Sequence, residues 1–490
     1  MGARELRVAF PYNKPVSFYD PIKIQLSPEY TFLENTISPL VEYTPSGELV
    51  SAVAEQFYWV GNEAHFKIRK NLRTIDDQII DAKDVELTFK RIMIVGTNTH
   101  GDLKDMLCPN TKMSSLDDDC PGIEIRDNDT TLVLKFNQKK IFLFPMLAAI
   151  DFGIIPRGSI DKKNLDITGY RNTSGPYFVL NEDKNGNIEL AANPNHFHFK
   201  KTMPQHIFLV PVGIKNPEES LALLSQNKID LITTVDQVSH DRMIRYAQKN
   251  SNIHLHKTLP LRTFAVTFTQ KGQKRFSITE RLSIGAKLKE IFLTTFENHD
   301  EYEPSEQLFS VFGEAALTKK QLDAIRYKFS SVQNILNPNK KMLAWIVRME
   351  FFKPDTPALK TNFPKTVFLA VNKVPGLLDF FKNKEDEPDF IVSGPDMGFL
   401  EDIGLLSYYL GAGYFHLYKK DADDWLRKYM SVEDKKKRMN LTRVLHFNTI
   451  AEGVSIPMAV SPYTALVRKP WSFDLSKVQA SDAIWRLNRE

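Results

Sequence analysis

Segments with the patterns of strands and of helices alternate along the whole chain, and no other sequence feature constrains its fold more. Leu6–Phe10 alternates in the manner of a first strand. Further strands are predicted near 229–233, 342–349, 366–371 and 389–393. Helices are predicted over 218–227, 281–297, 317–330 and 420–450. This alternation favours an α/β fold with partly parallel sheets.

Local signals define one helix start and two hairpins. Asp81 precedes a helix that runs through Arg91, and its carboxylate can accept hydrogen bonds from the free amides of the first turn. Asp127-Asn128-Asp129 separates the two alternating runs of a hairpin over 122–136. Asn185-Gly186 is the predicted turn of a second hairpin. The first part of the chain is therefore expected to be rich in strands.

Length and charge exclude several classes of protein. The chain has 490 residues, which suggests about three domains at roughly 150 residues per domain. Its 64 basic and 60 acidic residues give a net charge of +4. A dedicated nucleic-acid binder would carry a larger excess of basic residues. No apolar run of about 18 residues predicts a transmembrane helix. The first residues lack the apolar segment of a signal peptide, so we expect either a cytosolic protein or removal of the signal peptide.

The two cysteines, Cys108 and Cys120, flank a polar loop. Two thiols without further ligands do not make a zinc site. Two alternatives stay open: a surface disulfide that closes the loop in an oxidising compartment, or two unpaired thiols.

Catalytic motifs are scarce. One Ser-x-x-Lys arrangement occurs at Ser225 and Lys228, where some hydrolases use the lysine to activate the serine. It falls between a predicted helix and a strand, so we expect an exposed turn. The basic run Lys435–Arg438 has acidic neighbours in a predicted helix, and we interpret it as a solvated helix face. The chain has no phosphate loop, dinucleotide fingerprint or metalloprotease motif.

Two His-x-His pairs, His196/His198 and His254/His256, could each supply two metal ligands, because alternate residues of a strand share a face. No acidic residue or cysteine follows either pair at ligand spacing. We therefore interpret all four as solvent-facing histidines on half-buried strands, and we predict neither a metal site nor a cofactor.

Aromatic residues gather in the loop after the first strand and again around Gly411. They are Tyr12, Phe18, Tyr19, Tyr408, Tyr409, Tyr414 and Phe415. Aromatic side chains on loops offer a ligand large and rigid contact areas. For each of them, core packing is the alternative.

Several short motifs follow one another in an order typical of a single protein family. Leu6–Phe10 and the loop Ser17-Phe18-Tyr19-Asp20-Pro21 look like an opening strand and its S-L-D-P loop. The other matching segments are 40–57, 65–70, 81–91, 173–177, 193–197, 222–230 and 456–458. Together they resemble the solute-binding proteins of ABC importers that include oligopeptide, dipeptide and nickel binders (family 5), over nearly the whole chain.

This resemblance implies an α/β fold of the two-lobed periplasmic-binding-protein type (Venus-flytrap, class II-like) with an additional β-rich domain. Lobe I is expected to combine residues 1–44, 166–255 and 456–490. The extra domain is expected over 45–165 and lobe II over 256–455. Proteins of this kind enclose a ligand between lobes joined by a hinge, and they carry out no chemistry.

The sequence departs from the family pattern at four positions, two of them in the segment expected to contact the ligand. In the segment Ser393–Phe399, Pro395 stands in place of the usual Trp. Gly398 stands where peptide binders of the family have the Asp that pairs with the peptide's α-ammonium. Asp77 replaces the Gly of a D-G turn, and Ser51 replaces a Pro. The missing acid leaves blocked or murein-derived peptides, sugars and other small solutes open as ligands.

The resemblance implies a protein outside the cytoplasm, in the periplasm or anchored at the cell surface after removal of its signal peptide. It would capture a peptide-like or other small solute and deliver it to a membrane permease. We expect a monomer that binds no nucleic acid. The predicted ligand contacts are Tyr12, Asn13, Phe18, Tyr19, Trp345, Arg348, Asp396, Tyr408 and Tyr414. Arg348 could hold a carboxylate through two hydrogen bonds, or form a surface ion pair instead.

Two other functions stay open. A ligand sensor with this fold would pass its closed state to a regulator instead of a permease, and the missing acid at Gly398 is compatible with that. A hydrolase would need an activated nucleophile in the cleft, for which Ser225 is the only hint in the sequence.

Overall fold

The chain divides into two compact units, of which unit 1 comprises Met1–Thr258 and Thr464–Glu490 and unit 2 comprises Leu259–Tyr463. The computed structural model describes residues 5–11, 14–24, 27–96, 98–212, 218–233, 240–295, 302–308, 315–332, 337, 339–347, 352–371, 387–394, 425, 428–429, 431–475 and 483–489. The chain passes between the units within two long strands, β12 (Ile253–Phe268) and β17 (Ser455–Arg468). The lobe boundaries at 255/256 and 455/456 and the bounds of the extra domain stay predictions.

The sheet of unit 1 is built around β1 (Glu5–Phe10), which contains the predicted first strand. The strand order is β17, β11 (Leu231–Ile232), β1, β10 (His206–Pro211), β9 (Ile188–Ala192) and β8 (Tyr177–Glu182). β1 runs parallel to β10 and β11. Both faces of β1 are buried, since Leu6 and Val8 pack with α1 (Ser27–Thr36) while Ala9 packs with α5 (Glu218–Ser225) and α6 (His240–Lys249).

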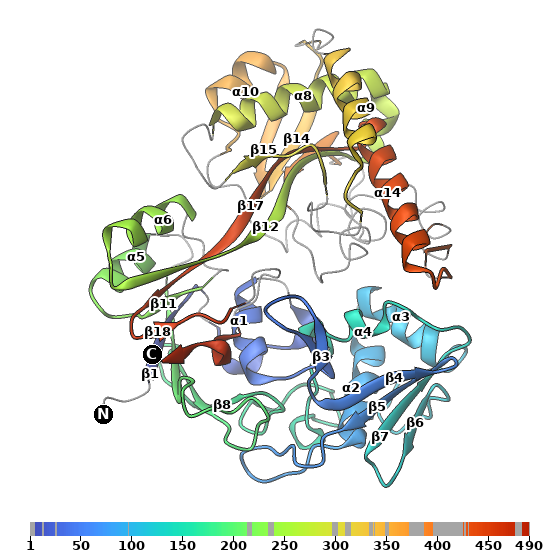
Figure 1. Cartoon of the computed structure of the whole chain (residues 1–490), viewed down its shortest axis with the longest axis vertical. Coiled ribbons are helices and arrows are strands. Elements are labelled where there is room, and N and C mark those ends of the chain that lie inside the picture. The colour runs from blue at the N-terminus through green and yellow to red at the C-terminus, as the bar shows by residue number, and fades with distance from the viewer. Residues whose placement is uncertain are drawn as a thin grey trace. The chain divides into compact units, whose positions relative to one another are not determined.

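A second, antiparallel sheet in unit 1 has the order β4 (Ala54–Val60), β5 (Glu63–Ile68), β7 (Thr131–Lys135) and β6 (Ile123–Arg126). Helices α2 (Ala82–Val95), α3 (Asn98–Leu107) and α4 (Leu143–Met146) share an apolar core with this sheet (Figure 1). Two short strand pairs complete unit 1, β2 (Val41–Tyr43) with β3 (Leu49–Ser51) and β18 (Trp471–Ser472) with β19 (Asn488–Arg489).

Local sequence signals explain where these elements begin and turn. Asp81 caps α2 as predicted, and it forms a reciprocal capping box with Asp84 three residues later. Asp127, Asn128 and Asp129 turn the β6–β7 hairpin with φ values of 56°, 53° and 66°. Asp and Asn tolerate this left-handed region better than other residues with a side chain. Cys108 and Cys120 are joined by a disulfide and lie in the core of this sheet and its helices.

Unit 2 contains strands in the order β15 (Thr366–Val371), β14 (Met342–Val347), β16 (Phe390–Ser393), β12 and β17, with β13 (Glu303–Pro304) beside β17. β14 runs parallel to both of its neighbours. Helices α8 (Ile278–Thr295) and α10 (Pro357–Asn362) share a core with this sheet, and α7 (Gln270–Arg275) follows β12. Helices α9 (Lys319–Ser330) and α14 (Lys435–Ala451) share a smaller core.

The fold class predicted from the sequence, a mixed α/β fold with partly parallel strands, is confirmed. Later strands and helices lie close to their predicted ranges, although α14 begins only at Lys435, behind the cap of Asp434. Within the described residues, no helix is both long and apolar enough to cross a bilayer.

Candidate functional site

In each unit, parallel strands end together at one edge of the sheet, and predicted contact segments follow those ends. Val8 pairs with Leu209 and Leu231, so β1, β10 and β11 end side by side in unit 1. In unit 2, Ala344 pairs with Phe390, and β14 and β16 end together. Ligands of α/β sheets bind outside the carboxyl ends of the strands. Each unit therefore offers one edge suited to a ligand.

The structure describes three of the nine predicted contacts. Phe18 and Tyr19 lie together in the loop after β1, with ring centroids 6.3 Å apart, and Trp345 lies in β14 of unit 2. Phe18 is 41% exposed, whereas Tyr19 and Trp345 are buried. The other six predicted contacts lie outside the described residues: Tyr12, Asn13, Arg348, Asp396, Tyr408 and Tyr414. Gly398 lies outside them as well. The ligand roles of all nine stay predictions.

Phe18 is the described candidate whose side chain can reach a ligand. It ends the short helix Val16–Phe18, and the Lys14 ammonium lies 4.9 Å from its ring centroid. The amide of Val16 donates to the carboxylate of Glu182 at 3.2 Å, which ties the start of this helix to β8. An exposed ring beside a cation offers a ligand both apolar contact area and positive charge.

Tyr19 has a packing role in this structure. Its ring stacks on Phe32 with centroids 4.4 Å apart, and Tyr170 packs edge-on against the same Phe32 ring. The Tyr170 hydroxyl donates to the Tyr19 carbonyl at 2.7 Å. Burial raises the pKa of Tyr170 well above its ordinary value, so this hydroxyl stays protonated as a donor. These contacts hold the backbone beside Phe18.

The same loop is anchored by a buried ion pair. Arg91 of α2 donates to Asp20 through both terminal guanidinium nitrogens, at 3.0 and 2.5 Å, and through Nε to the Leu165 carbonyl at 2.6 Å. Asp20 also accepts from the Ile22 amide at 3.2 Å and so caps the turn Pro21–Lys23. The predicted family motif Ser17–Pro21 therefore has a structural role in holding the loop.

In unit 2, the described part of the predicted site is the end of the sheet. Trp345 is fully buried in β14 between β15 and β16, and this strand ends two residues later at Val347. Gly394 follows β16, and a Cβ there would lie 2.8 Å from the Phe264 ring. The close approach of the Phe264 ring therefore requires a glycine at position 394, where the segment that also contains Gly398 begins.

Thr233 lies at the edge of the unit 1 sheet and is not among the residues predicted from the sequence to contact a ligand. It directly follows β11 and is 2% exposed, and its hydroxyl has no hydrogen-bond partner. Its only sequence signal is its place at the end of the predicted strand 229–233.

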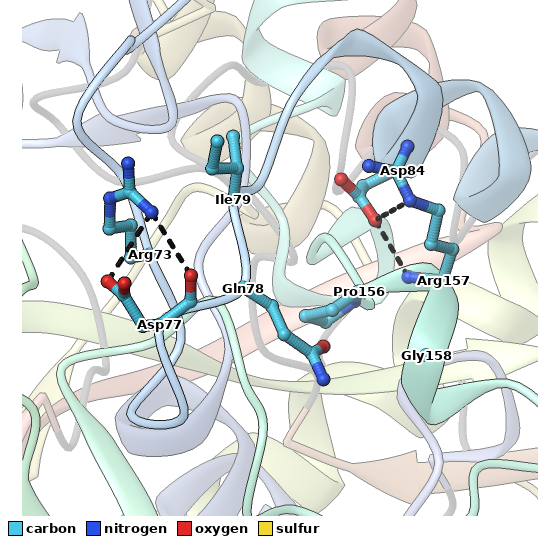
Figure 2. Close-up of a pocket in the computed structure, with 8 residues that line it drawn as sticks. All are labelled: Arg73, Asp77, Gln78, Ile79, Asp84, Pro156, Arg157 and Gly158. Carbon is cyan, nitrogen blue, oxygen red and sulfur yellow. Dashed lines mark hydrogen bonds and ion pairs between the residues drawn. The ribbon is translucent and has the colours of Figure 1, made fainter.

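A separate pocket of about 500 Å³ lies in unit 1 between the turn before α2 and the segment Pro156–Gly158 (Figure 2). Figure 2 shows that its charged side chains pair with one another: Arg73 with Asp77, and Arg157 with Asp84. Burial raises the pKa of Asp84 above its ordinary value. Asp77 has a φ of 63°. This left-handed conformation is one that the glycine usual at this position in the family adopts without strain. Because the charged side chains of this pocket pair with one another, we assign the pocket no ligand.

The histidine pairs differ from the prediction. Residues 193–199 form turns rather than a strand, because the Asn193 side chain accepts from the Asn195 amide and Pro194 cannot donate to a ladder. His196 is buried beside Ser38, and burial lowers its pKa well below the ordinary value. His198 pairs with Glu42 and stacks on Trp485.

The second pair does lie on a strand, β12, but His256 is buried rather than solvent-facing. Among the residues that the structure describes, no group of three or more His, Cys, Asp or Glu side chains is placed to hold a metal ion.

The Ser-x-x-Lys arrangement lies in an exposed turn, as expected. The Ser225 hydroxyl donates to the Ala222 carbonyl at 2.7 Å, and both Ser225 and Lys228 are exposed. A serine that donates to its own helix at the surface is not arranged as an activated nucleophile.

Comparison with known proteins gives a family match and a fold match. The model of "Bacterial extracellular solute-binding proteins, family 5 Middle" matches residues 48–282. No curated protein sequence matches the chain. Among solved structures, Helicobacter pylori DppA in complex with the peptide STSA superposes with a TM-score of 0.76 at 15% identity, over 99% of this chain and 98% of that one.

Two further structures superpose equally well. Haemophilus influenzae OppA in complex with RPPGFSPFR gives a TM-score of 0.75 at 13% identity, over 99% of each chain. The binding protein AgaA from A. tumefaciens R10, in complex with agropinic acid, gives 0.75 at 15% identity, again over 99% of each chain. The resemblance predicted from the sequence is thus confirmed over residues 48–282, which match the family-5 model of extracellular solute-binding proteins, and the chain has the two-lobed α/β fold with an extra domain seen in these solved structures.

Proposed function

We propose that this protein captures a peptide-like or other small solute between its two units and delivers it to the permease of an ABC importer. The observation that carries the proposal is the pair of strands β12 and β17, within which the chain passes from one compact unit to the other. Two such connections allow the units to open and close about a hinge. A ligand that contacts both units would favour the closed form by its differential affinity.

The strand ends support the same function. Unit 1 carries the anchored loop with the exposed Phe18, and unit 2 carries the ends of β14 and β16. Arg348 directly follows β14 in the sequence, and Asp396 lies three residues after β16. A charged ligand needs opposite charges when it is enclosed, because an unpaired buried charge is costly. We propose these segments as the two halves of the binding site.

We propose no reaction for this protein. Family 5 is a family of binding proteins, and the one serine motif lies in a surface turn. We also propose that the protein acts outside the cytoplasm, in the periplasm or at the cell surface, as a monomer that binds no nucleic acid.

Recovery of the natural ligand tests this proposal. The protein is purified from its host without denaturation, and native mass spectrometry measures the mass of any bound solute. Thermal unfolding is then followed with pools of free, blocked and murein-derived peptides and of sugars. A ligand at 100 times its Kd adds about 2.7 kcal/mol to the free energy of unfolding. If no solute co-purifies and no pool raises the melting temperature, the proposal is wrong.

Two controls make the test specific. Phe18→Ala is expected to weaken binding of the recovered solute, whereas Tyr58→Ala removes a similarly exposed ring on β4 and should leave binding unchanged. Uptake of the recovered solute by host cells that lack the gene separates import from sensing, since a sensor would leave uptake intact.

A further inference from the structure

The hydroxyl of Thr233 is buried in unit 1 and has no hydrogen-bond partner. Other buried threonines of the described chain do find partners: Thr36 donates to the Phe32 carbonyl at 3.0 Å, and Thr88 donates to the Asp84 carbonyl at 2.8 Å. A buried hydroxyl without a partner costs about 1–3 kcal/mol, the desolvation of that group. Valine has the same shape and would avoid this cost, so the threonine calls for an explanation.

Its position supplies that explanation. Ile232 pairs with Leu466 of β17, and Leu231 pairs with Val8 of β1. Thr233 is the next residue, so it stands at the carboxyl end of β11, level with the end of β1 at Phe10 in the parallel register. The loop anchored by Asp20 and Arg91 starts from that same end. The hydroxyl therefore belongs to the edge of the unit 1 sheet where α/β proteins bind ligands.

We infer that the Thr233 hydroxyl is a ligand contact, held for a hydrogen bond to a polar group of the bound solute. The inference rests on the proposed function, because the carboxyl end of β11 belongs to the sheet edge of unit 1 that we propose as one half of the binding site. The ligand group is an amide, hydroxyl or carboxylate, since each can pair with a threonine hydroxyl.

This contact has a consequence for specificity. A binding site with a buried polar group selects strongly against a ligand that cannot form a hydrogen bond to that group, because the protein's polar group then stays unpaired in the complex. Thr233 would thus favour solutes with a polar group at this edge over apolar ones of similar shape. It would add a polar ligand contact in unit 1 to the apolar contact proposed for Phe18.

The test separates ligand binding from folding. Thr233→Val removes the hydroxyl and keeps the shape, and Thr233→Ser keeps the hydroxyl. The probe is the solute that co-purifies with the wild-type protein from its host, identified by its mass and then titrated into each ligand-free variant. Thr233→Val is expected to raise the Kd about tenfold, the loss of one hydrogen bond. Its ligand-free melting temperature should be unchanged or higher, and Thr233→Ser should bind almost as wild type.

Ser283 of α8 provides the matched control, because its hydroxyl is also buried and without a partner but lies within a helix of unit 2. Ser283→Ala should leave the Kd unchanged. Equal Kd values for the wild type and Thr233→Val would overturn the inference while the proposed function stands, and so would a lower ligand-free melting temperature of Thr233→Val. If the wild type carries no solute and responds to no pool, the proposed function fails, and the inference fails with it.

Discussion

Arg91 and Asp20 lie 71 positions apart in the sequence and form a buried ion pair with N–O distances of 3.0 and 2.5 Å. Arg91 is 1% exposed and Asp20 is 6% exposed. The pair joins α2 to the loop that carries Phe18. The rigidity of that loop, and hence the presentation of its exposed ring, therefore depends on a helix that is not itself part of the proposed site.

Asp20→Asn should destabilise the protein by about 3–5 kcal/mol, because it leaves the Arg91 guanidinium buried without its counter-charge. The change is measured as a shift in the midpoint of urea unfolding. The loop should also become less ordered, so the affinity for a recovered solute should fall.

Asp76→Asn is the matched control, because Asp76 also accepts two hydrogen bonds from one guanidinium, Nε and a terminal nitrogen of Arg171, but at the surface. Its unfolding midpoint should hardly change, since exposed ion pairs contribute little. Equal effects of the two substitutions would show that burial does not set the strength of the Arg91–Asp20 pair.

The parts of the fold that depend on local chemistry could be predicted from the sequence. Asp81 was identified as a helix cap because its carboxylate satisfies amides within the same turn. The Asp127–Asp129 hairpin turn and the strand Leu6–Phe10 were predicted for similar reasons. In each case the residues whose interactions determine the local structure lie within a few positions of one another in the chain.

Features that depend on distant partners could not be predicted. His196 was placed on a strand from an alternating pattern, but its neighbour Asn193 turns the chain and its ring bonds to Ser38, 158 residues away. The burial of Tyr19 follows from stacking on Phe32, which a loop sequence does not reveal. Thr233 was missed because an unpartnered hydroxyl can be recognised only when all its neighbours are known.

The disulfide between Cys108 and Cys120 should contribute about 3 kcal/mol to stability, the value expected for a loop of this size. A reductant should therefore lower the urea midpoint of the wild-type protein. The double variant Cys108→Ser/Cys120→Ser should unfold at the reduced midpoint with and without reductant. If the reductant leaves the urea midpoint of the wild-type protein unchanged, the assignment of the disulfide is contradicted.

His446 of α14 should make stability depend on pH. Its Nε2 accepts from the Leu308 amide at 2.8 Å, and its Nδ1 lies 2.8 Å from the Ala315 carbonyl, to which it donates when neutral. Burial lowers the pKa of His446 from 6.5 to about 4. The unfolded chain then binds the proton more readily between these values, so stability falls as the pH drops from 6.5 to 4, by at most about 3 kcal/mol.

His446→Gln removes the titrating group and keeps a side chain that can donate and accept. It should be less stable than the wild type at pH 7, and the difference should narrow as the pH falls towards 4. Free energies of unfolding at half-unit pH steps measure this difference. A constant difference across the window would mean that His446 takes up its proton equally in both states.

Gly175 should tolerate no side chain. Its amide donates to the Thr36 carbonyl at 3.1 Å, and a Cβ would press against the carbonyl carbon of Thr36 and lie 2.5 Å from the amide nitrogen of Ile37. Backbone atoms in a packed core cannot give way as a flexible side chain can, so Gly175→Ala should cost about 3 kcal/mol. The loss is read from the urea midpoint.

Gly158→Ala is the control for this substitution, because a Cβ there meets only the Gln78 side-chain oxygen, at 3.1 Å. That oxygen ends a flexible side chain at the pocket of Figure 2 and can rotate away. The control should therefore unfold close to the wild-type midpoint. If Gly175→Ala does so as well, the segment Thr173–Tyr177 must be able to move away from α1, and its glycine is not needed for packing.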